Sequence, residues 1–180
     1  MIVLGIDPSS TSTGYGVLEG TGRRHRFIAC GCIRPPRSAS FDDRLVYLHH
    51  HLSETIEEYQ PEQVAIESSF FGKDADAAAK LGEARGVIRL AVRQAGVEPQ
   101  FYTPAEAKKA VVGNGQASKE QVQFMITRLL RLEEAPRPLD ASDALAIALC
   151  HINRSAVAPQ ARTAGRRPEV EALLARVARR

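Results

Sequence analysis

The sequence lacks a long hydrophobic run. No apolar stretch approaches the roughly 20 residues of a membrane-spanning helix, so we expect neither a membrane segment nor a membrane partner. A strand pattern starts directly after Met1, and we therefore expect no signal peptide. Cysteine is also scarce, because the chain has only 3, without the spacing of a zinc site. We interpret them as reduced thiols, mostly in the core, of a cytoplasmic protein: Cys30, Cys32 and Cys150.

The sequence also has little net charge, formally +3, but this charge is unevenly distributed. From Arg154 onward there are seven arginines and two glutamates, a net of +5, whereas the preceding 153 residues sum to −2. Nucleic-acid binding by the body would therefore need a local basic surface. The length of 180 residues and the 44% hydrophobic content predict one globular domain over residues 1–153. A basic, flexible tail would follow over residues 154–180.

Acids end two of the expected strands. Residues 2–17 read IVLGIDPSSTSTGYGV, an apolar run that ends in Asp7 and is followed by Pro8 and a Ser/Thr-rich turn. Residues 64–67, VAIE, form a second short apolar run that ends in Glu67. An acid at the end of a buried strand is costly to desolvate unless a cation meets it. The two acids therefore indicate a candidate metal site.

A second pair of acids stands at the start of the apolar segment DASDALAIAL. Asp140 and Asp143 are spaced i, i+3, which puts both carboxylates on one helix face. With the two strand-end acids they would form an all-oxygen cluster of the kind that Mg²⁺ prefers. Two such ions can clamp a phosphodiester for in-line attack by water. Simpler interpretations exist for each acid: Asp7 as a turn residue, Asp140 as an N-cap and Asp143 as a first-turn acid.

The apolar periodicity predicts an α/β fold. Short turns between the first three strands favour an antiparallel meander. The fourth strand follows a helix, so we expect it to run parallel to the first and to bring Glu67 beside Asp7. The expected strands are 2–7, 14–20, 24–34, 64–67 and 98–103. The expected helices are one capped by Ser40 and ending near Tyr59, 76–95, a short one from Pro104, one capped by Ser118, and 139–152.

Other residues have both a functional and a simpler interpretation. Phe70 and Phe71 follow Glu67 in a loop, where one can be core and one exposed, or an aromatic can stack on or wedge between bases. Lys108 and Lys119 flank a glycine turn, and the simpler interpretation of each is a solvated surface residue, as for most lysines. Lys119 carries more weight, because a cation in the first turn of a helix opposes the macrodipole and a bound anion would remove that conflict.

Two further features of the expected helices need an explanation. Three consecutive histidines, 49–51, suggest a metal site, but consecutive residues point to different helix faces, so we predict solvated helix surface. Gly82 and Gly86 lie inside the helix 76–95, where each costs about 1 kcal/mol relative to alanine. Close helix approach would offset this cost, either across a dimer interface or onto the sheet.

The order of strands and the placement of the acids resemble the ribonuclease H-like fold. This fold is a five-stranded mixed sheet, with three antiparallel strands followed by parallel strands, flanked by helices. Within it, several motifs together resemble the bacterial RuvC crossover-junction (Holliday junction) endodeoxyribonuclease family. They occur in the family's order and spacing from Met1 to about Ile152: LGIDPSSTSTGYGV, GCIR, VAIESSFF, AAKLGEARGV, AKKAVVGNGQASKEQVQ and DASDALAIAL.

The resemblance implies a site and a reaction. It implies four metal-binding catalytic carboxylates for two Mg²⁺ ions, with Mn²⁺ as a substitute: Asp7, Glu67, Asp140 and Asp143. It also implies Lys119 near the cleaved phosphate, Lys108 at the DNA surface and Phe70 acting on bases near the junction centre. Family members are homodimers that work with the RuvA–RuvB branch-migration complex in recombination and repair. They nick two strands of like polarity symmetrically across a four-way junction, leaving 5′-phosphate and 3′-hydroxyl ends.

Three other functions share parts of this pattern. A sugar-kinase or actin-like ATPase needs two lobes and a second glycine-rich phosphate loop, for which this chain is too short. A non-catalytic junction-binding module would not need all four acids. A ribonuclease H-like nuclease that acts on RNA is the third, and testing RNA–DNA hybrids beside junctions would distinguish it. Glu83, where glutamine is common in the family, and the acidic loop GKDAD depart from the family pattern and bear on DNA affinity and sequence preference.

Overall fold

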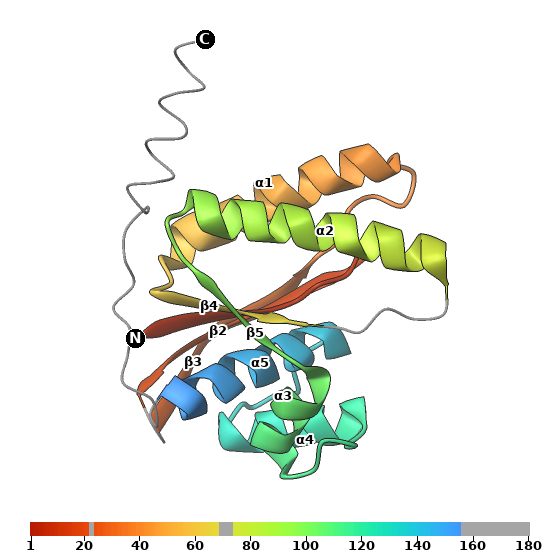
Figure 1. Ribbon diagram of the computed structural model, residues 1–180. Coiled ribbons are helices and arrows are strands. Elements are labelled where there is room, and N and C mark those ends of the chain that lie inside the picture. The colour runs from red at the N-terminus through yellow and green to blue at the C-terminus, as the bar shows by residue number, and fades with distance from the viewer. Residues whose placement is uncertain (22–23, 69–73, 156–180) are drawn as a thin grey trace.

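The computed structural model describes residues 1–21, 24–68 and 74–155, which form three layers around one sheet (Figure 1). Helices α1 and α2 cover one face, and α5 covers the other with α3 and α4 beside it. The strands are β1 (Ile2–Asp7), β2 (Thr13–Thr21), β3 (Arg24–Ile33), β4 (Gln63–Glu67) and β5 (Pro99–Tyr102). The helices are α1 (Phe41–Tyr59), α2 (Ala75–Gln94), α3 (Pro104–Val112), α4 (Lys119–Leu129) and α5 (Leu139–Ser155).

The sheet has the strand order β3-β2-β1-β4-β5. Strands β1, β2 and β3 pair antiparallel, whereas β4 pairs parallel with β1 and β5 pairs parallel with β4. This arrangement confirms the predicted mixed sheet and the predicted direction of the fourth strand. Because Ile6 lies opposite Ile66 in the parallel register, the acids that follow them end at the same edge of the sheet.

The pleat of the strands decides the face on which these acids lie. Successive side chains of a strand point to opposite faces. Along β1, Leu4 and Ile6 are buried in the core beneath α1 and α2, whereas Val3 is buried in the core beneath α5. Asp7 has the same parity as Val3, and Glu67 the same parity as Ala65, which also packs beneath α5. Both strand-end carboxylates therefore leave the sheet toward α5.

Glycines allow α5 to lie close to the sheet. A Cβ atom on Gly5 would lie 2.1 Å from the Ala144 carbonyl oxygen, and one on Gly14 would lie 2.2 Å from the Asp140 carbonyl oxygen. Real Cβ atoms do not approach backbone oxygens this closely, so a side chain at either position would push the helix away. These two glycines set the depth at which the acids of α5 stand against the end of β1.

The helix starts follow the sequence signals. Ser40 Oγ accepts a hydrogen bond from the Asp43 amide at 3.1 Å, and Ser118 Oγ accepts one from the Gln121 amide at 3.2 Å. Both predicted N-caps are thus confirmed. Helix α5 continues to Ser155, three residues past its predicted end at Ile152. The division into residues 1–153 and a tail over 154–180 stays a prediction, because residues 156–180 lie outside the described part.

No helix within the described ranges is both long enough and apolar enough to cross a bilayer. The three cysteines are free thiols. Cys150 is buried in the core beneath α5, whereas Cys30 and Cys32 are half-buried on β3.

Candidate active site

Carboxylates from β1 and α5 converge where β1 ends. Ligand oxygens of Asp7, Asp140 and Asp143 all lie within 4.8 Å of one another. Asp140 and Asp143 stand in the first turns of α5, which begins at Leu139, so Asp140 is inside the helix rather than its N-cap. The simpler interpretation of Asp140 as a cap is therefore wrong. The three carboxylates form the acid cluster of this structure.

A cavity of about 220 Å³ opens beside the acid cluster. Glu67, at the end of β4, lines it together with Asp7 and Asp143, although the Glu67 carboxylate lies outside the 4.8 Å group. Lys108 from α3 and Lys119 from α4 line the same cavity. The apolar part of the wall is Pro104, Ala107, Val122 and Ala146. The structure thus brings together the four predicted acids and the two predicted lysines.

Burial and crowding make the charge on Asp7 costly. Desolvation by burial, together with the negative charges of Glu67 and then Asp143, raises the pKa of Asp7 from 3.8 to about 8. Desolvation likewise raises the pKa of Asp143, although the hydrogen bond from Lys119 opposes this shift. Full ionisation of the cluster therefore needs more positive charge than the neighbouring lysine supplies.

Lys119 forms an ion pair with the acid cluster. Its ammonium nitrogen lies 2.7 Å from Asp143 Oδ2 and 3.7 Å from Asp140 Oδ1, and half of its side chain is exposed. Desolvation lowers the pKa of Lys119, but the hydrogen bond and the charge of Asp143 outweigh it and the net shift is upward. A nearby anion removes the conflict between Lys119 and the macrodipole of its helix, and in this structure that anion is the Asp143 carboxylate.

The turn after β1 supplies an orienting contact that the sequence did not reveal. Ser12 Oγ donates to Asp140 Oδ2 at 2.9 Å and accepts from Arg34 Nε at 3.2 Å. The buried Thr13 hydroxyl donates to the Ser9 carbonyl at 2.7 Å and holds this turn. Arg34 and Ser12 therefore link β3 to Asp140 and fix one of its oxygens. The only sequence signal was the run of hydroxyl residues after Asp7.

The aromatic pair predicted to meet DNA cannot be placed. Phe70 and Phe71 lie in residues 69–73, outside the described part of the chain. Their proposed contact with bases therefore stays a prediction from the sequence.

The acid cluster fits a hard divalent cation. Its donors are carboxylate oxygens, which Mg²⁺ and Mn²⁺ prefer over nitrogen or sulfur. The raised pKa of Asp7 shows that these oxygens crowd negative charge in a partly buried place. A divalent cation held between Asp7, Asp140 and Asp143 would offset that charge, and Glu67 lies along the adjoining cavity.

When metal is removed, the unfavourable negative charge of the acid cluster should make the stability of the protein depend on pH. Because the pKa of Asp7 is raised to about 8, the folded protein binds a proton that the unfolded chain has lost, so stability falls as pH rises toward 8. The pKa of His151, which burial lowers to about 4 from 6.5, gives the opposite trend below pH 6.5. In EDTA, we expect the free energy of unfolding to decrease from pH 6.5 to 8. Urea unfolding would measure it.

An Asp7→Asn protein provides the control for this pH dependence. It should lose most of the decrease and be more stable than the unsubstituted protein at the upper end of the range. A stability that rises over the same range in EDTA, or a decrease that Asp7→Asn leaves unchanged, would show that Asp7 is not the titrating group.

The fold and the acid cluster define a nuclease of the ribonuclease H-like class. The family model for crossover junction endodeoxyribonuclease RuvC matches residues 3–151. The chain therefore belongs to the RuvC family.

Individual relatives agree with this assignment. The RuvC of Alkalilimnicola ehrlichii is 46% identical over 163 residues, 91% of this chain and 98% of the relative. That of Desulforamulus reducens is 45% identical over 151 residues, 84% of this chain and 93% of the relative. The solved structure of Thermus thermophilus RuvC in complex with Holliday junction substrate matches with a TM-score of 0.82 at 36% identity, covering 87% of this chain and 96% of that one. The yeast mitochondrial Holliday junction resolvase Ydc2 shares the fold at 13% identity, with a TM-score of 0.60 over 84% of this chain and 77% of its own.

Proposed function

We propose that this protein resolves four-way DNA junctions by metal-dependent cleavage of phosphodiester bonds. The observation that carries the proposal is the convergence of Asp7, Asp140 and Asp143 beside a cavity that Glu67 and Lys119 also line. The match to a RuvC solved with a Holliday junction substrate supports the choice of DNA. The products would be symmetric nicks in two strands of like polarity, with 5′-phosphate and 3′-hydroxyl ends.

Asp7, Glu67, Asp140 and Asp143 would hold the metal, which we propose to be two Mg²⁺ ions with Mn²⁺ as a substitute. Metal bound there supplies Lewis-acid chemistry, lowering the pKa of water and stabilising the leaving oxygen. Asp7 is central to the set, because its charge interacts with those of the other three acids. Ser12 keeps one oxygen of Asp140 oriented through its 2.9 Å hydrogen bond.

The lysines of the cavity would bind the phosphate. Lys119 stands at the first turn of α4, where backbone amides and the macrodipole also favour an anion. Its half-exposed ammonium group would neutralise the charge that develops on the cleaved phosphate. Lys108 lines the same cavity and would contact the DNA backbone. Phe70 or Phe71 would stack on bases near the junction centre.

We propose that the protein is a homodimer, because a symmetric junction needs two active sites related by two-fold symmetry. The glycines of α2 support this. A Cβ atom on Gly82 or Gly86 would meet no atom of residues 1–21, 24–68 or 74–155 within 4 Å, so packing on the described sheet does not explain these glycines. Leu90 continues their i, i+4 spacing and is 53% exposed. A second copy of α2 approaching this face would account for all three residues.

Replacing Gly86 by leucine should weaken the dimer, because the larger side chain would hold the two helices apart. The substituted chain should still fold, since a Cβ atom at Gly86 lies in open space among the described residues. Analytical ultracentrifugation would measure the dissociation constant. Lys80→Leu places the same side chain elsewhere on α2 and should leave the dimer intact. Equal dissociation constants for the Gly86→Leu and Lys80→Leu dimers would show that the interface does not include Gly86.

The proposal extends to cellular partners through the family. The protein would act in the cytoplasm after the RuvA–RuvB complex has moved the junction to a cleavable sequence.

The deciding experiment is cleavage of a synthetic mobile four-way junction with Mg²⁺, with Mn²⁺ and with EDTA. Linear duplex and RNA–DNA hybrid of matching sequence serve as comparison substrates. Metal-dependent paired nicks confined to the junction would support the proposal. Tight junction binding without cleavage in any metal would indicate a binding module, and preferential cutting of the hybrid would indicate a ribonuclease.

A further inference from the structure

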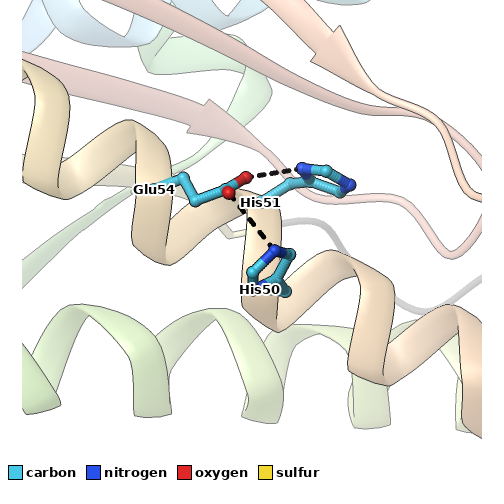
Figure 2. A group of neighbouring side chains, drawn as sticks. All are labelled: His50, His51 and Glu54. Carbon is cyan, nitrogen blue, oxygen red and sulfur yellow. Dashed lines mark hydrogen bonds and ion pairs between the residues drawn. The ribbon is translucent and has the colours of Figure 1, made fainter.

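Three side chains of types that can bind a metal converge at the surface of α1 (Figure 2). His50 Nε2 lies 3.2 Å from one carboxylate oxygen of Glu54, and His51 Nδ1 lies 2.7 Å from the other. All three donor groups lie within 4.8 Å of one another. The rings and the carboxylate face one another at the helix surface (Figure 2).

The helix period explains a convergence that the sequence analysis did not predict. Consecutive histidines do point about 100° apart around a helix, but Glu54 is four residues after His50 and three after His51. Both spacings place side chains on one face, and Glu54 lies between the two histidines. The expectation of solvated helix surface stays a prediction for this pair, because both side chains are partly exposed although they converge on one carboxylate. His49 does not join them, because its Nε2 bonds Gln94 of α2 at 2.8 Å.

The donor set differs in chemistry from that of the acid cluster. Two imidazole nitrogens and a carboxylate suit zinc and similar borderline transition metals, whereas Mg²⁺ prefers oxygen alone. Three protein ligands leave the fourth position of a tetrahedral ion for water. His50, Glu54 and His51 expose 66%, 55% and 37% of their side chains, so an ion can reach them from solvent.

Neighbouring groups hold the site in place. The His51 ring lies against the Tyr47 ring with centroids 4.0 Å apart, which restricts its rotation. The Thr55 hydroxyl donates to the His51 carbonyl at 2.8 Å. Helix α1 packs on the face of the sheet opposite α5, so the cluster is separated from Asp140 and Asp143 by the sheet (Figure 1).

We propose that His50, His51 and Glu54 form a second metal site, selective for zinc-class divalent ions and independent of the catalytic acids. Each histidine binds through the nitrogen that now faces Glu54, and the carboxylate completes the protein ligands. The site rests on this geometry alone and does not depend on the proposed nuclease activity.

Calorimetric titration of the full-length protein with Zn²⁺, in excess Mg²⁺ to occupy the oxygen site, tests the proposal. We expect one Zn²⁺ per chain at micromolar affinity. His50→Gln and Glu54→Gln should each weaken Zn²⁺ binding at least about tenfold. Loss of a residue that only hydrogen-bonds a metal ligand already costs about tenfold in affinity, and these two residues are proposed to be ligands themselves. His49→Gln is the matched control, because it removes the adjacent histidine and should leave affinity unchanged. Asp143→Asn should also retain the site.

Co²⁺ provides a second readout that does not involve activity. Visible absorption of the tetrahedral Co²⁺ complex should appear with the unsubstituted protein and with His49→Gln, and should be lost with His50→Gln. Cleavage of the junction in Mg²⁺ should be the same for all of these histidine variants. No zinc binding by the unsubstituted protein, or equal binding by His50→Gln, would overturn the proposal.

Discussion

Replacing Asp7 by asparagine should reduce junction cleavage by well over about a hundredfold. Loss of a residue that only hydrogen-bonds a metal ligand already costs about 10–100-fold in metal affinity or activity, and Asp7 is proposed to be a ligand itself. Asparagine keeps the size of the side chain but removes the charge that interacts with those of the other three acids. Junction binding should remain, since phosphate contacts by basic residues supply most of the affinity for DNA. Cleavage in Mg²⁺ and gel-shift binding in EDTA would separate the two effects.

Glu54→Gln is a matched control for Asp7→Asn, because it also replaces a carboxylate by the isosteric amide, here at an exposed residue on the opposite side of the sheet. It should cleave at the unsubstituted rate. Retained cleavage by Asp7→Asn would count heavily against the proposed role of the acid cluster, and loss of junction binding would show that the substitution disturbs more than the metal site.

Replacing Gly14 by alanine should both destabilise the protein and abolish cleavage. The added methyl group would lie 2.2 Å from the Asp140 carbonyl oxygen, so α5 must move or β2 must distort. Overpacking costs about 1–3 kcal/mol and at times more, and a clash with backbone belongs at the upper end of this range. Urea unfolding would measure the loss, and Mn²⁺ binding would report the displaced acids.

Gly86→Ala makes the same chemical change at a position where no atom in the described part of the chain lies within 4 Å of the added methyl group. At protein concentrations low enough to keep the chain monomeric, it should raise stability by up to about 1 kcal/mol through helix propensity. If Gly14→Ala were equally harmless, the close approach of α5 to the sheet would not be what positions Asp140.

Much of the fold and most of the site followed from local signals. Ser40 and Ser118 marked helix starts because a short hydroxyl side chain satisfies first-turn amides. The helix between the third and fourth strands indicated that β4 runs parallel to β1, which in turn placed Glu67 and Asp7 at one edge. The i, i+3 spacing correctly put Asp140 and Asp143 together on α5. These features depend on neighbours in sequence or on the direction of one strand.

The remaining features depend on side-chain contacts that no local pattern encodes. Ser12 and Asp140 are 128 residues apart, and their hydrogen bond exists only because α5 begins beside the β1–β2 turn. The environment of Gly86 became clear only once the packing of α2 was known. The cluster around Glu54 is different, since the i+3 and i+4 spacings that bring His51 and His50 to this carboxylate are local features of the sequence.

The ion pair between Lys119 and Asp143 means that the acid cluster already carries a counter-ion. A metal that binds Asp143 must compete with this ammonium group, so its apparent affinity includes the cost of breaking the pair. A DNA phosphate beside Lys119 offers the lysine another partner and weakens that competition. Metal and substrate should therefore bind with positive thermodynamic coupling, each raising the affinity of the protein for the other by the same factor. The enzyme would then load its metal most tightly when a junction is in place, with Lys119 as the exchangeable group that links the two events.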